Sequence, residues 1–282
     1  MTTLSRLAQE PPFVVCGAES AFRVGPITAD GAGIHAVMQT GPWTVGPDGR
    51  PSFGSLGVLV DDMLGYAIVR ARPDGHWATS TEIHVEFSDH LPHDGSALFA
   101  ESQAVVLDPS SGLAQGRVFD SSGRTIAIAS QRLRFIPATS AALAMAANPA
   151  SAPIFDVSDG TTLEQLRGTL TRHGKGASLT FPLGPAVSNP MSTLHGGIML
   201  CATEIVGNHA VQSNDHPLTT AAVHIAYLRP GPVEGEVTFE ATTIHRGRRL
   251  ALARVVSRNA EGKLCTHATV TAHAHSPSAL GM

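Results

Sequence analysis

Apolar residues along the chain recur with the periods of both helices and strands. From Ile198 to Ala210 the apolar positions fit a largely buried helix, and Gly196-Gly197 stand where the first backbone N–H groups of that helix lack internal partners. Shorter apolar runs bounded by turn residues predict strands. We expect these strands at 34–40, 78–88, 96–107, 114–120 and 124–135, and again at 176–183, 218–228, 235–245, 249–258 and 263–275.

Between the two sets of strands, residues 138–160 change in composition to Ala, Ser and Pro and show no helical stripe. This composition predicts a linker. It separates two units of similar length, residues 12–137 and 161–276, and equal halves are the expected sign of a duplication. The 282 residues are enough for each unit to bury a core.

The two halves contain a weak internal repeat. The run that begins at Phe53 aligns without gaps to the run that begins at His195, and this alignment places Asp62 opposite Glu204. Each half then has the order strand, loop, helix and four strands. We therefore predict an α+β fold with one antiparallel sheet on one helix in each half, the halves pairing through edge strands. The other matched segments are Ile83–Phe87 with Val223–Tyr227, Leu98–Glu101 with Val237–Glu240, and Asp120–Gly123 with Asn259–Gly262.

The Gly196-Gly197 turn and the carboxylate of Glu204 are the chemical features of the second half. Free N–H groups at a helix start carry partial positive charge and stabilise a carbonyl oxygen that becomes negative. Glu204 lies among apolar residues, so its lost solvation requires a partner or a use. However, Gly196 and Glu204 are about 12 Å apart along one helix, too far to act on the same atom. The acid that serves Gly196 must come from the other half.

Asp62 is the favoured acid for that position because it aligns with Glu204, and its neighbour Asp61 is the reserve. The alternative is that these buried acids only bond to polar groups at a seam. The first half lacks the glycine turn, since Phe53 stands where His195 stands in the second half. We therefore expect one working site per chain, with Glu204 of lesser weight.

The spacing of a second-half motif resembles that of the hotdog-fold thioesterases of the phenylacetate-degradation type. Asn189 is followed six positions later by His195-Gly196-Gly197, and an acid comes nine positions after the histidine. The family often has Gly where this chain has Ser192, and often Asp where it has Glu204. The resemblance implies two tandem hotdog units, each an antiparallel sheet wrapped on a central helix, packed as a pseudo-two-fold double hotdog.

The resemblance also implies an activity, the hydrolysis of an acyl-CoA thioester. Asn189 and the turn, including Ser192 and Gly197, would hold the substrate. The Gly196 N–H would polarise its carbonyl, and the acid would act as base or nucleophile. No cofactor is implied beyond the coenzyme A of the substrate. Two other functions stay open, a hotdog enoyl-CoA hydratase or dehydratase and a non-catalytic acyl-CoA-binding protein. His195 itself is expected to hold the turn by hydrogen bonds.

Two further groups of side chains have both a chemical and an ordinary interpretation. Arg246, Arg248 and Arg249 lie in a turn between strands, where they are suited to the phosphates of coenzyme A or simply to solvent. Three histidines on one strand face, His267, His273 and His275, favour an exposed polar face over a metal site, so no metal is expected.

Composition excludes several classes of function. The net charge of −4 and the charged fraction of 15% give no basic field for nucleic acid. No apolar run approaches the roughly 20 residues that cross a bilayer. The first residues do not have the order of a signal peptide, so a cytoplasmic protein is expected. Cys16, Cys201 and Cys265 form no metal or disulfide pattern, and association into a homo-oligomer stays open.

Overall fold

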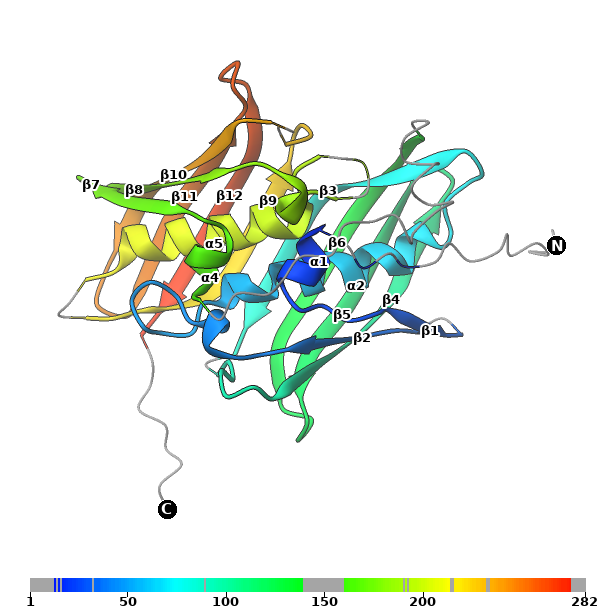
Figure 1. Cartoon of the computed structure of the whole chain (residues 1–282), viewed down its shortest axis with the longest axis horizontal. Coiled ribbons are helices and arrows are strands. Elements are labelled where there is room, and N and C mark those ends of the chain that lie inside the picture. Colours follow the sequence, from blue (N-terminus) through cyan, green and yellow to red (C-terminus); the bar gives the residue numbers. More distant parts are fainter. Residues whose placement is uncertain are drawn as a thin grey trace.

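The computed structural model describes residues 13, 15, 17–31, 33–88, 90–138, 160–189, 191, 193–213, 216–231 and 234–274. In this part of the chain, twelve strands form one antiparallel sheet with the order β1-β2-β4-β5-β6-β3-β9-β12-β11-β10-β8-β7. Each half of the sheet curves around one long helix, α2 (Gly57–Val69) or α5 (Gly196–Val211) (Figure 1). The fold is therefore the expected double hotdog.

The remaining elements follow in chain order. The first half contains α1 (Gly17–Ala21), β1 (Thr28–Asp30), β2 (Gly33–Gln39), η1 (Pro42–Thr44), η2 (Phe53–Leu56), β3 (His76–Phe87), β4 (Ala97–Asp108), β5 (Ser111–Asp120) and β6 (Thr125–Pro137). The second half contains α4 (Thr162–Gln165), β7 (Thr169–His173), β8 (Gly176–Pro182), η4 (Pro185–Val187), β9 (Thr219–Tyr227), β10 (Glu236–Arg246), β11 (Leu250–Arg258) and β12 (Leu264–His273).

Each of the ten predicted strands is present with ends that lie within about three residues of the expected ones, the usual uncertainty of such boundaries. Four short elements, β1, β7, α1 and α4, were not predicted, because a periodic pattern of apolar residues needs a longer segment. The linker expected at 138–160 lies, apart from its two end residues, outside the described residues, so the proposed unit boundaries stay a prediction. No helix in the described ranges is long and apolar enough to cross a membrane.

The two halves meet through β3 and β9, which pair in antiparallel register. His84 lies opposite His224, while Ile83 faces Ile225 and Val85 faces Val223 on either side of that pair. The register is symmetric about the histidine pair, so the two half-sheets are related by a pseudo-two-fold axis. This is the pairing of edge strands that the repeat predicts.

The helices α2 and α5 touch each other at glycines near their first turns. A Cβ atom on Gly197 would lie 2.5 Å from the backbone oxygen of Gly57, closer than real contacts allow. Glycine at this crossing lets the two backbones approach closely. As a result, the start of each helix lies beside the side chains of the other helix.

Candidate active site

Asp61 of α2 points its carboxylate at the first turn of α5. The Gly197 N–H donates to Asp61 Oδ2 over 2.8 Å, and a Cβ on Gly196 would lie 2.7 Å from the same oxygen. The other oxygen, Oδ1, accepts from the Ser80 hydroxyl over 3.2 Å and from the Gln131 side-chain amide. The Gln131 amide also donates to Ser80 Oγ over 2.8 Å. One carboxylate thus joins side chains of β3 and β6 to the positive end of α5.

The expected placement of Asp62 against the Gly196 turn is wrong, because Asp61 occupies that position. The equivalent contact in the other half joins Glu204 to Gly54, whose N–H donates to Oε2 over 3.0 Å. These paired contacts make Asp61 the counterpart of Glu204 and Gly54 the counterpart of Gly197. The gap-free alignment was therefore displaced by one residue in the helix. Each acid does come from the opposite half, as the length of the helix requires.

Ser80 and Gln131 are two residues of the site that the sequence did not predict. On β6 the buried positions alternate through Ala127, Ala129, Gln131, Leu133 and Phe135, so Gln131 is a polar residue on an otherwise apolar inward face. A buried amide at such a position needs hydrogen-bond partners. The period-two pattern contained this signal, whereas nothing in the local sequence marks Ser80.

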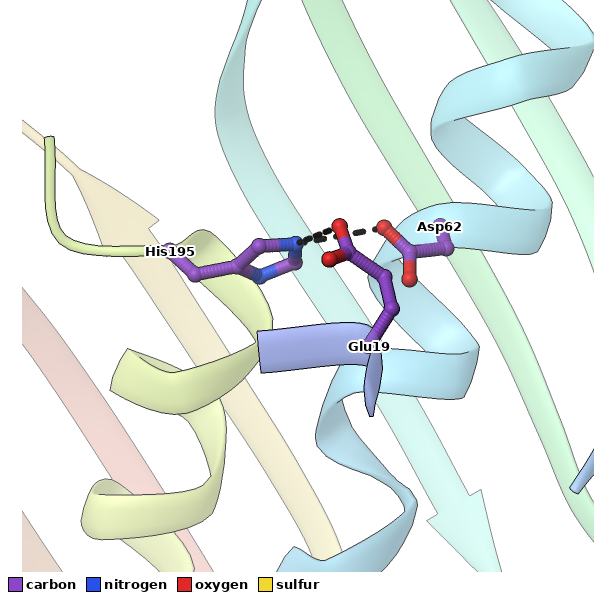
Figure 2. Close-up of side chains that lie close together, drawn as sticks. All are labelled: Glu19, Asp62 and His195. Carbon is purple, nitrogen blue, oxygen red and sulfur yellow. Dashed lines mark ion pairs between the residues drawn. The ribbon is translucent and has the colours of Figure 1, made fainter. Parts of the chain in front are cut away.

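His195 lies at the N-cap of α5 within a cluster of acids (Figure 2). Its Nε2 lies 3.2 Å from Asp62 Oδ1 and 3.4 Å from Oε1 of Glu19, which α1 contributes. Its Nδ1 lies 3.3 Å from Asp61 Oδ2 and accepts from the Gly197 N–H over 3.0 Å. The imidazole therefore links three carboxylates around the helix start. Glu19 had no signal in the sequence, since α1 itself was not expected.

Burial and charge act in opposite directions in this cluster. Burial alone lowers the pKa of His195, but Asp62, Glu19 and Asp61 together raise it well above 6.5. Burial raises the pKa of Asp62 to about 7 despite the nearby imidazole. Glu19, Asp62 and His195 each offer one oxygen or nitrogen atom within 4.8 Å of the others. The distances from Nε2 are also those of hydrogen bonds.

Asn189 shapes the loop before α5. Its Oδ1 accepts from the N–H groups of Met191 and Thr193, both over 3.0 Å, and its amide donates to Thr193 Oγ1 over 2.8 Å. The Tyr227 hydroxyl donates to the carbonyl oxygen of Gly196 over 2.9 Å and fixes the turn from the β9 side. Asn189 thus bonds within its own loop, and it also lines the adjacent cavity. Ser192 lies outside the described residues.

A cavity of about 520 Å³ opens beside Asp61. Its wall includes Asp61, Ser80, Gln131 and Gly196. Within the described residues the Gly196 N–H has no hydrogen-bond acceptor, so it is available to a bound group. The cavity is large enough for an acyl group of moderate size. Its apolar walls include Phe13, Val69, Trp77, Leu133, Ile136 and Met199.

Glu204 has the same backbone contact as Asp61 but does not line the cavity beside Asp61. Besides the Gly54 N–H, its carboxylate accepts from the hydroxyls of Ser52 and Thr220, and the residue is only 1% exposed. Burial raises the pKa of Glu204 in spite of these three donors. Phe53, fully buried and packed 5.0 Å from the ring of Phe87, lies beside it.

A second cleft of about 410 Å³ lies on the outer side of Phe53, and Glu204 is not part of its wall. Arg248 lines this second cleft, while the Arg246 guanidinium donates to Ser213 Oγ over 2.8 Å. Neither residue, nor Arg249, lines the cavity beside Asp61. The arginine turn therefore lies away from the cavity beside Asp61, near the site that the pseudo-two-fold axis relates to it.

Two family models match the chain. The model described as the acyl-CoA thioesterase N-terminal domain matches residues 185–273, and the model described as the C-terminal domain of the same family matches residues 9–135. Together they cover more than half of the chain, with the two units in the opposite order. Asp61, Ser80 and Gln131 thus lie in the unit similar to the family's C-terminal domain.

Individual proteins give the same picture at lower similarity. A protein of Saccharolobus solfataricus that is named as an esterase is 32% identical over 80 residues, which is 28% of this chain and 53% of the length of that relative. The structure is similar to an acyl-CoA thioesterase II from Mycobacterium marinum, with a TM-score of 0.59, 11% identity and coverage of 93% and 99% of the two chains. A protein from Thermobifida fusca described as a thioesterase II gives a TM-score of 0.62 at 14% identity, with coverage of 93% and 98%. At these identities the structural matches show the fold alone.

Proposed function

We propose that this chain, which belongs to the acyl-CoA thioesterase family, is a thioester hydrolase that hydrolyses an acyl-CoA in the cavity beside Asp61. The observation that carries this proposal is the position of the Asp61 carboxylate. It faces an open cavity while Ser80, Gln131 and the Gly197 N–H hold it in place. The apolar walls of the cavity support an apolar acyl group. The phenylacetate-degradation subtype stays a prediction.

The free Gly196 N–H at the positive end of α5 is suited to bind the thioester carbonyl oxygen. As water adds to the carbonyl carbon, that oxygen becomes negative, and the N–H and the helix dipole stabilise it. Such a donor contributes on the order of 10²–10³ in rate. This is the role that the resemblance implies for Gly196.

Asp61 is suited to take the proton from the attacking water. Both of its oxygens accept hydrogen bonds from protein groups, which makes the carboxylate a weaker nucleophile but leaves it able to act as a base. The Ser80 hydroxyl and the Gln131 amide would orient the water beside it. Asp61 then returns the proton to the departing thiolate, so that thioester and water give a carboxylic acid and free coenzyme A.

The geometry favours hydrolysis over hydration of an enoyl-CoA. A hydratase needs an acid and a histidine free to move protons at two neighbouring carbons of the substrate. Here both nitrogens of His195 are engaged, one with Asp62 and Glu19 and the other with Asp61 and the Gly197 N–H. The proposed reaction uses no cofactor.

The test is release of free thiol from a panel of acyl-CoA substrates that differ in chain length. We expect release for at least one apolar acyl group, with no change in enoyl absorbance. Tight binding of all substrates without release would leave a binding protein instead.

A single turnover in ¹⁸O-water then separates the two possible roles of Asp61. If water attacks the thioester directly, the acid product carries ¹⁸O after one turnover. If Asp61 attacks first and water then opens the mixed anhydride at the Asp61 carboxyl carbon, the label enters the protein, and the first product remains unlabelled.

A further inference from the structure

Glu19 enters the cavity wall from α1, a short helix that precedes the strands of the first half. The short helix α1 packs against η4, and a Cβ on Gly17 would lie 2.5 Å from the backbone oxygen of Pro185. Gly17 has φ +35°, a conformation that favours glycine. The chain before the first sheet is thereby fixed to the loop that precedes α5, and it places the carboxylate of Glu19 beside His195 (Figure 2).

The Glu19 carboxylate lies with two other carboxylates around one imidazole. Glu19 is 2% exposed, and the side chains of Asp62 and Asp61 are 9% and 11% exposed. Carboxylates this close together repel one another, and a positive charge between them offsets that repulsion. His195 is the one titratable base in contact with all three in the described structure.

The titratable groups that face His195 come from two elements, Glu19 from α1 and Asp61 and Asp62 from α2. On the β9 side the Tyr227 hydroxyl donates to the carbonyl oxygen of Gly196. Among the described residues, this hydroxyl makes no hydrogen bond to the imidazole of His195. The acids on the Nε2 side are therefore Glu19 and Asp62, and the acid on the Nδ1 side is Asp61.

We propose that Glu19 is a positioning residue of the hydrolase, which with Asp62 holds His195 as a cation so that its Nδ1–H and the Gly197 N–H both donate to Asp61. The proposal rests on the proposed function, since it assigns Glu19 to the orientation of the base in that reaction. The raised pKa of His195 supports it.

The protonation state of His195 decides where the Gly197 N–H points. When Nδ1 lacks a proton, it accepts from the Gly197 N–H over 3.0 Å and competes with Asp61 Oδ2 for that donor. When Nδ1 carries a proton, it donates to Asp61 Oδ2 at 3.3 Å. The Gly197 N–H then donates to Asp61 only, because Nδ1 can no longer accept from it. The cation also adds positive charge at the start of α5, beside the Gly196 N–H. Loss of the His195 proton thus removes a hydrogen bond that orients Asp61. It also weakens the stabilisation of negative charge beside the Gly196 N–H.

The direct test is an NMR titration of His195 in the full-length protein with labelled histidine. The signal is assigned by its absence in His195→Gln. In Glu19→Gln, which keeps the shape and removes the charge, we expect the pKa of His195 to fall by about one pH unit or more, as for the loss of one charge-assisted hydrogen bond. Glu19→Asp keeps the charge and should restore most of the shift. An unchanged His195 titration in Glu19→Gln would overturn the proposal.

The matched control is Glu164→Gln. Glu164 lies in another short helix, α4, where it forms a capping box with Thr161, so the substitution makes the same change in net charge away from the site. This variant should titrate as the wild type does. If Glu19→Gln fails to fold, Glu19→Asp and the control still decide, because a shorter acid must give an intermediate pKa of His195.

The kinetic test is the dependence of kcat and KM on pH. Because activity needs protonated His195, it is lost as pH rises through the pKa of that group, and this loss should begin at lower pH in Glu19→Gln. We expect kcat to fall about tenfold at pH values between the two pKa values, with KM changed less than about twofold. An equal loss of kcat at every pH would assign Glu19 a merely structural role. Absence of thiol release by the wild type would instead refute the proposed function, while the titration of His195 would still stand.

Discussion

Two acid–glycine contacts are related by the pseudo-two-fold axis of this molecule, but only one of them lies beside the cavity. Asp61 crosses from the first half to accept from the Gly197 N–H, and Glu204 crosses from the second half to accept from the Gly54 N–H. Each acid also accepts a hydrogen bond from a side-chain hydroxyl on a neighbouring strand. The donor is Ser80 of β3 for Asp61 and Thr220 of β9 for Glu204. The backbone geometry is thus nearly the same at both sites.

The difference lies in the residue before each donor glycine. Gly196 lines the cavity beside Asp61, whereas the buried Phe53 stands at the equivalent position before Gly54, and Glu204 is only 1% exposed. The Glu204 carboxylate is therefore hydrogen-bonded but closed to a substrate. A buried, well-bonded acid at a helix start is not by itself a site, because a reacting group must also be able to reach it.

The largest expected effect is that of removing the base from the open site. Asp61→Asn should reduce kcat by about 10³ or more, since the amide keeps the shape but cannot take a proton. Glu204→Gln should stay within about tenfold of the wild type, because its site is closed. Thiol-release kinetics of the two variants decide the comparison, and an active Asp61→Asn beside an inactive Glu204→Gln would reverse it.

The next largest effect concerns the side chains that support each acid. Gln131→Leu should lower kcat about 10²-fold with little change in KM, because the amide orients Asp61 and the attacking water. The matched change in the closed site, Thr220→Val, should leave kcat nearly unchanged. It should lower the free energy of unfolding by about 1–3 kcal/mol, since Glu204 loses a buried partner. Equal kinetic losses in both variants would contradict the distinction between the sites.

The donor glycine of the closed site should matter for stability alone. A Cβ at Gly54 would lie 2.7 Å from the Cys201 backbone oxygen and 3.0 Å from Glu204 Oε2. We expect Gly54→Ala to cost about 1–3 kcal/mol through overpacking, as measured by denaturant unfolding. The activity of the folded fraction should remain, and a large loss of kcat per folded molecule would show that the closed site takes part in turnover.

A smaller effect is expected in the pH dependence of stability. Burial raises the pKa of Glu204 above its ordinary 4.5, so the folded state binds its proton more tightly than the unfolded chain does. The stabilisation is fully present below pH 4.5 and is lost as pH rises through the folded pKa. Wild type should therefore gain unfolding free energy relative to Glu204→Gln as pH is lowered from 7 toward 4.5. Parallel pH curves for the two proteins would show that Glu204 is ionised throughout.

The smallest effect is expected at the second cleft. Arg248 lies there and not beside Asp61, so Arg248→Gln should change kcat/KM for an acyl-CoA by less than about twofold. Steady-state kinetics at low and high salt give the measurement. A large rise in KM at low salt would place the coenzyme A phosphates on the arginine turn after all.

Several features of the fold could be read from the sequence because they depend on local periods. Alternation of apolar residues located ten strands, and the linker composition and repeated motifs indicated two units. The rise of about 1.5 Å per helical residue already required Gly196 and its acid to come from different halves. These quantities are set by neighbours along the chain.

Other features depend on how the two halves pack, and only the tertiary structure decided them. Successive helical residues point about 100° apart, so the close crossing of α2 and α5 at Gly57 and Gly197 selects Asp61 and turns Asp62 toward His195. Ser80, Gln131 and Glu19 reach the site from β3, β6 and α1, whose side chains meet only after the sheet and helices have packed. Likewise, Phe53 is buried against the ring of Phe87, a contact that forms only once η2 and β3 have packed together. Local spacing determined which elements form, and the contact between the two halves determined which acid faces open space.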